Sequence, residues 1–147
     1  EIGRRPARGR RAVLIVTDNE GLNYQTPDED VVRALFEADA VLNAIVVKRG
    51  RRPAAPRPGQ FLNPDFTPSN VFGIAERTGG EAFEGGKIGA SFREMIERIR
   101  SRYSLHYAAP EAPGGGLRRI RVELAGAARR KHADAVVRAR AGYYSRR

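Results

Sequence analysis

The fold is decided by one stretch of sequence, Arg11-Ala-Val-Leu-Ile-Val-Thr-Asp18. An unbroken apolar run from Ala12 to Val16, rich in β-branched residues, stops at Thr17 and Asp18. A run this short and this uniformly apolar predicts a strand covered on both faces, of the kind found at the centre of parallel α/β sheets. Asp18 then lies where the strand meets a loop, at the edge where open α/β sheets place their ligands.

The residues after Asp18 predict a strand–helix–strand unit. A polar loop covers residues 19–25. A helix is predicted from Thr26 to about Ala40, with Val31, Val32, Leu35 and Phe36 at helical spacing. A second apolar run over residues 41–47 predicts another buried strand. Short connections of this kind join parallel neighbouring strands through a right-handed crossover.

A proline- and arginine-rich insertion over residues 48–68 interrupts this pattern. Thr67-Pro68 then opens a helix that ends at Gly79-Gly80, and residues 81–84 are a candidate short strand. Apolar residues at positions i, i+3, i+4 and i+7 from Phe92 to Ile99 predict an amphipathic helix.

The last part of the sequence alternates between apolar and polar residues in segments 103–107 and 119–124, and residues 135–141 form a third run with Val136 and Val137 at its centre. Alternation with period two is typical of strands that expose one face to water. We therefore predict an antiparallel β extension of the parallel sheet. The expected organisation is a flexible basic lead-in over 1–10, an α/β core over 11–101 and a β extension of the same domain over 102–147.

Composition limits the classes of function. A chain of 147 residues without cysteine has no disulfide framework, thiol catalysis or zinc–thiolate site. No apolar run approaches the roughly 18 residues that a membrane-spanning helix needs. The chain begins with Glu1 and shows no signal peptide, which suggests a processed product or a piece of a longer polypeptide.

The net charge of +10 has two interpretations. Only three of the 27 basic residues are lysines, and a GC-rich genome produces such arginine, alanine and glycine usage without functional meaning. No nucleic-acid motif accompanies the charge, so we do not expect nucleic acid as the main partner. The alternative is an arginine-rich binder of nucleic acid or another anionic surface. Its contacts would be Arg49, Arg51, Arg52, Arg57, Arg118, Arg119, Arg121, Arg129 and Arg130, with Tyr143 and Tyr144 as stacking groups.

The sequence does not favour an enzyme. The two histidines, His106 and His132, have no nucleophile or carboxylate at a spacing known from catalytic motifs. The glycine-rich pieces lack the following Lys-Ser/Thr and helix of a phosphate-binding loop. We therefore predict that the chain is not an enzyme.

Several stretches, taken in order, resemble the second half of a von Willebrand factor type A (vWA) domain. They are the strand and acid at 12–18, the apolar strand at 41–47, Ile-Ala-Glu-Arg-Thr-Gly-Gly-Glu-Ala-Phe at 74–83 and Arg-Tyr-Ser-Leu-His-Tyr at 102–107. The ending Arg-Ala-Arg-Ala-Gly-Tyr-Tyr at 138–144 resembles the VWFA-related subfamily seen in acidobacteria. The Thr-Gly-Gly and Gly-Tyr-Tyr pieces are the most specific.

The resemblance implies a partial Rossmann-like α/β sheet and a role in cell adhesion or other protein binding. In the family, a divalent metal ion is held by an Asp-x-Ser-x-Ser loop, a threonine from a later loop and an aspartate after a later strand. Asp18 matches this aspartate, whereas the Asp-x-Ser-x-Ser piece is absent and Thr17 does not match the threonine. Because one carboxylate cannot satisfy Mg²⁺, this chain alone should bind Mg²⁺ or another divalent cation weakly or not at all.

The resemblance also implies how a partner would bind. The partner-binding residues would be those at the end of the first strand and in the loop after it, namely Asp18, Asn19, Glu20, Asn23 and Tyr24. Without the other half of the domain, the apolar first strand becomes an exposed edge. We therefore expect another chain or fragment, or residues 1–11 with a neighbouring molecule, to cover it. Family members are often exported, which favours an extracytoplasmic or secreted location.

Overall fold

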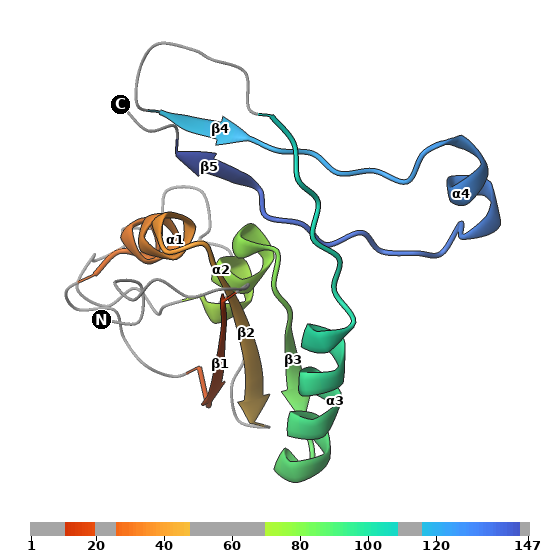
Figure 1. Cartoon of the computed structure of the whole chain (residues 1–147). Helices are drawn as coiled ribbons and strands as arrows, with labels where there is room; N and C mark the ends of the chain where they lie inside the picture. Colours follow the sequence, from red (N-terminus) through yellow and green to blue (C-terminus); the bar gives the residue numbers. More distant parts are fainter. Residues whose placement is uncertain (1–10, 20–25, 48–69, 109–115, 145–147) are drawn as a thin grey trace, which may run out of the picture.

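The computed structural model describes residues 11–19, 26–47, 70–108 and 116–144. These residues form an α/β fold with a three-stranded parallel sheet flanked by helices, and a separate two-stranded antiparallel sheet (Figure 1). None of the helices in these ranges has the length and apolar character that crossing a membrane requires.

The parallel sheet consists of β1 (Arg11–Thr17), β2 (Ala40–Val47) and β3 (Ala82–Gly85), in that spatial order. Helix α1 (Asp28–Glu37) connects β1 to β2, and the connection from β2 to β3 includes α2 (Val71–Thr78). Both strand pairs are parallel. This confirms the predicted strand–helix–strand unit, and the short strand that the sequence suggested at 81–84 lies one residue later.

Helices cover both faces of β2, which places the core at the central strand. Leu42, Ala44 and Val46 pack on one face against buried residues of α1 and α2. Ile45 faces the other way, where helix α3 (Ile88–Arg100) contributes the buried Ser91 and Met95. The amphipathic helix predicted around Phe92–Ile99 is therefore present, although the Phe92 side chain is 47% exposed.

β1 is an edge strand among the described residues, rather than the central strand that its composition suggested. Val13 and Ile15 pack against the α1–α2 core, but Ala12 and Val16 on its opposite face are exposed. The expectation of cover on both faces is therefore not met within the described ranges. The edge position of β1 in these ranges is the one that the sequence analysis expects for this strand when no other half of a domain is present.

The C-terminal region differs from its prediction. Strands β4 (Leu117–Arg119) and β5 (Gly142–Tyr144) pair as their own antiparallel sheet and do not extend the parallel one. Residues 102–108 and 135–141 contain no strand, and the expected turn from Gly126 contains helix α4 (Gly126–Lys131). Alternation alone was misleading here, because these segments have no layer to bury their apolar side chains.

The β4–β5 sheet is attached at the amino end of the parallel strands (Figure 1). The Tyr144 ring packs on Phe36 of α1, with 6.3 Å between ring centroids. The backbone N–H of Ala141 donates to the carbonyl oxygen of Arg77 at 2.8 Å. The carboxyl ends of the parallel strands, where Asp18 lies, are thus at the other edge of the sheet.

Candidate functional site at the carboxyl edge of the parallel sheet

Asp18 lies directly after β1 and is exposed at the carboxyl edge of the sheet. The next residue, Asn19, adopts a left-handed conformation with φ 57°, which turns the chain sharply at this point. Its backbone N–H donates to the Thr17 hydroxyl at 3.0 Å. The turn therefore ends the strand and leaves the Asp18 residue at the surface.

Asn19 is buried, unlike Asp18. Its side-chain Oδ1 accepts a hydrogen bond from the backbone N–H of Val71, the first residue of α2, at 3.4 Å. The side chain thus ties the end of β1 to the start of a helix. The other three predicted partner-binding residues, Glu20, Asn23 and Tyr24, lie outside the described residues.

Two more polar side chains hold the helix starts at this edge. Asp28 Oδ2, at the start of α1, accepts from the backbone N–H of Asn70 at 2.9 Å. Asn70 in turn caps α2, because its Oδ1 accepts from the N–H of Gly73 at 3.1 Å. Sequence reasoning missed Asn70, although an asparagine directly before Val71 is a common helix N-cap.

These contacts decide how well the described residues fit a divalent cation. Asn19 Oδ1 and Asp28 Oδ2 already accept backbone N–H groups, and the Thr17 hydroxyl accepts the N–H of Asn19. Within the described ranges, no group of three acidic or histidine side chains is positioned to hold a metal. Because Mg²⁺ needs about six oxygen ligands, these residues do not fit a Mg²⁺ site by themselves.

A salt bridge links the end of α2 to the first turn of α1. Arg77 near the end of α2 donates to the Glu29 carboxylate in the first turn of α1. This hydrogen bond lowers the pKa of Glu29 below its ordinary value. The pair lies at the surface, so its contribution to stability is small.

Behind the edge, a buried asparagine organises the middle of the sheet. Asn43 of β2 is fully buried, and its Nδ2 donates to the carbonyl oxygen of Val13 in β1 at 3.5 Å. Its Oδ1 accepts from the backbone N–H of Glu81 at 3.3 Å and from Arg102 Nη2 at 2.9 Å. One side chain therefore joins β1, β2, the approach to β3 and the segment after α3. The sequence analysis did not single it out.

The Thr-Gly-Gly piece of the vWA resemblance has a structural explanation. The Thr78 hydroxyl accepts from the backbone N–H of Leu42 at 3.1 Å. Gly79 has φ 81°, and a Cβ at Gly80 would lie 1.6 Å from the carbonyl oxygen of Leu42. The three residues thus allow α2 to end directly against β2.

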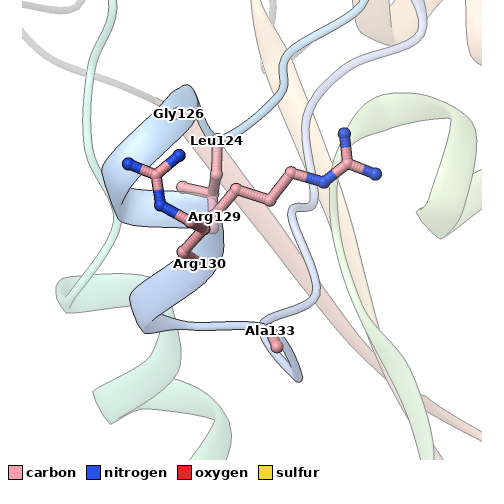
Figure 2. A pocket seen from close by; sticks show the side chains of 5 residues that line it. All are labelled: Leu124, Gly126, Arg129, Arg130 and Ala133. Atoms are coloured by element: carbon pink, nitrogen blue, oxygen red, sulfur yellow. The ribbon is translucent and has the colours of Figure 1, made fainter.

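The described arginines of the alternative anionic-surface hypothesis form two groups, one at β4 and one on α4. Arg121 pairs with Glu123, while Arg119 is exposed and Arg118 is half-buried in β4. Arg129 and Arg130 border a hollow on α4 (Figure 2). The other four arginines of the proposed set, Arg49, Arg51, Arg52 and Arg57, lie outside the described residues.

The two tyrosines of that hypothesis are engaged within the fold. Tyr144 packs on Phe36, and the Arg33 guanidinium lies 5.2 Å from the centroid of its ring. Tyr143 meets Tyr107 edge-on at 6.3 Å between centroids. Both tyrosines are half-buried, so they are poor platforms for stacking bases. His106 and His132 are exposed, the latter at the end of α4.

No known protein family, curated protein sequence or solved structure matches this chain.

Proposed function

We propose that this chain is the second half of a vWA-type, non-enzymatic protein-binding module, which meets its partner at the carboxyl edge around Asp18. The observation that carries the proposal is the placement of Asp18. An exposed carboxylate follows the first strand of a parallel sheet, at the edge where α/β folds bind ligands.

The topology supports the same proposal. The strand order β1-β2-β3, with both pairs parallel and each strand added to the same side, is the arrangement expected of one half of a doubly wound sheet. In such a sheet, the other half would pair with the free side of β1. The exposed Val16 and Ala12 on β1 are the surface that this half would bury.

The attachment of the C-terminal region also agrees with a binding edge at Asp18. The β4–β5 sheet contacts α1 and the end of α2 at the amino side of the parallel strands (Figure 1). The described part of the chain therefore leaves the Asp18 side accessible. A metal-assisted contact would require oxygen ligands from the other half, since the described residues do not fit the ion alone.

The proposal is tested by quantitative affinity capture with three forms of the full chain as bait. Asp18→Ala and Asp18→Asn remove the exposed carboxylate, the second without changing its size. Asp134→Ala serves as the control, because it removes an exposed acid beyond α4, far from the Asp18 edge. We expect at least one protein partner to bind the wild type and the control roughly tenfold more tightly than either Asp18 variant.

Direct titration of each captured partner then gives the affinities. If every partner binds the Asp18 variants as well as it binds the wild type, the Asp18 edge is not the binding site. A partner lost equally with Asp134→Ala would likewise point to general charge effects and contradict the proposal.

A further inference from the structure

A short basic helix forms the tip of the long connection between β4 and β5 (Figure 1). Its last turn carries Arg129, Arg130 and Lys131, and His132 follows directly. Every residue in the range 125–138 is exposed. The tip therefore contributes no side chain to the core and presents its charges to solvent.

Arginines elsewhere in the described residues are mostly used inside the chain. Arg98 binds Glu81 and Glu94, Arg77 binds Glu29, and Arg140 binds Asp39. By contrast, the side chains of the three basic residues in α4 form no ion pair with any described acidic residue. Basic groups at the end of a helix do interact favourably with its dipole. That effect is modest and leaves their hydrogen-bond donors available to another molecule.

The shape of the tip limits what it can bind. Arg129 and Arg130 border a hollow of about 490 Å³ together with Leu124, Gly126 and Ala133, and their side chains leave the helix in different directions (Figure 2). In this conformation the two guanidinium groups lie apart from each other. They suit an extended ligand that offers several carboxylates along its length, each able to accept paired N–H donors from an arginine.

We propose that α4 is a docking site for an acidic segment of a partner protein, meaning a run of aspartate and glutamate residues. The carboxylates would bind Arg129, Arg130 and Lys131, and the aliphatic parts of the segment would lie over Leu124 and Ala133 in the hollow. This site goes beyond the proposed function at Asp18. It lies on a different part of the molecule, so both sites can be occupied together (Figure 1).

The tip fits an acidic protein segment better than a nucleic acid. Nucleic-acid binding without a sequence motif relies on many phosphate contacts and on aromatic side chains that stack with bases. Residues 124–134 contain three arginine and lysine residues and no phenylalanine, tyrosine or tryptophan. Tyr143 and Tyr144 are packed against other side chains of the fold.

The test is fluorescence anisotropy of a labelled decaglutamate peptide titrated with the full chain at low salt. Arg129→Gln with Arg130→Gln removes two charges from α4 while keeping residues of good helix propensity. The control variant is Lys87→Gln with Arg93→Gln, which removes two exposed charges at the start of α3. We expect the Kd for decaglutamate to rise roughly tenfold for the α4 variant and less than twofold for the control.

Three results would overturn the proposal. The first is that the wild-type chain does not bind decaglutamate. The second is that both variants weaken binding equally, which general electrostatic attraction would cause. In the third, the wild type binds a single-stranded decanucleotide more tightly than decaglutamate, and the α4 variant loses that binding. Because Asp18 is unchanged in every form, these results are separate from any failure at the Asp18 edge.

Discussion

Gly80, two residues after the end of α2, packs directly against the backbone of β2. A Cβ built on it would lie 1.6 Å from the carbonyl oxygen of Leu42 and 3.1 Å from a methyl group of Val41. No side-chain rotation relieves a clash with a backbone atom, so any other residue must push the approach to β3 away from β2. The hydrogen bond from the Leu42 N–H to the Thr78 hydroxyl lies next to this contact and would be strained by the same displacement.

Gly80→Ala should therefore destabilise the protein by about 3 kcal/mol or more, measured by urea unfolding followed by circular dichroism. Gly86→Ala is the matched control, because a Cβ there meets nothing within 4 Å. We expect Gly86→Ala to change the free energy of unfolding by less than about 1 kcal/mol, and any change should be toward a more stable protein. Equal effects of both substitutions would show that the close approach at Gly80 is not present in solution.

Single residues were predictable from sequence to different degrees. The exposed position of Asp18 at the carboxyl edge was predictable, because this acid comes one residue after the end of an apolar run. Asn19 was assigned to partner binding, yet its side chain is buried against the start of α2. Asn43 could not be identified, because nothing in a sequence shows which polar residue of an apolar strand has partners at residues 13, 81 and 102.

At the scale of elements, the packing of α1 on α2 includes one charged contact, between Arg77 and Glu29. The hydrogen bond from Arg77 lowers the pKa of Glu29, so the folded state binds a proton at this carboxylate less readily than the unfolded chain does. The stabilisation is therefore fully present above the unfolded pKa of about 4.3 and is lost as the pH falls through the lower folded pKa.

Glu29→Gln should lower the free energy of unfolding by a few tenths of a kcal/mol at pH 7, because the pair is largely exposed. The difference from wild type should shrink between pH 5 and the lowest pH at which the protein stays folded. Urea unfolding across that range measures it, and a double-mutant cycle with Arg77→Gln isolates the pair from the helix dipole. A difference that grows on acidification would contradict the assigned contact.

Elements in the first two thirds of the chain were predictable because each apolar pattern there is matched by a layer of the fold that buries its apolar side chains. Strand β2 is apolar apart from Asn43 and is buried along most of its length, and α1 and α3 show helical spacing of their apolar residues. The C-terminal segments carried one signal, period-two alternation, without layers to bury their side chains. Tyr103 is 91% exposed and Val136 73% exposed, so alternation there did not produce strands. Pairing instead occurs at β4 and β5, where Tyr144 packs on α1.

At the scale of the whole molecule, the parallel sheet is unevenly covered. Helices pack on both faces of β2, while β1 has one strand neighbour and an exposed outer face within the described ranges. Val16 on this face is 48% exposed. A parallel, apolar edge strand of this kind readily pairs with another chain, because pairing forms hydrogen bonds to the backbone groups along its edge and buries its apolar side chains.

The uneven cover leads to a prediction about assembly. The isolated chain should behave as a dimer or larger species in size-exclusion chromatography with light scattering. Val16→Lys should shift it toward the monomer, since a buried lysine without a partner opposes pairing at β1. Val136→Lys makes the same chemical change at an exposed position on the return from α4 and should leave assembly unchanged. A wild-type chain that is monomeric and unfolds cooperatively would mean that β1 needs no second polypeptide, and the proposal of a half module would then fail.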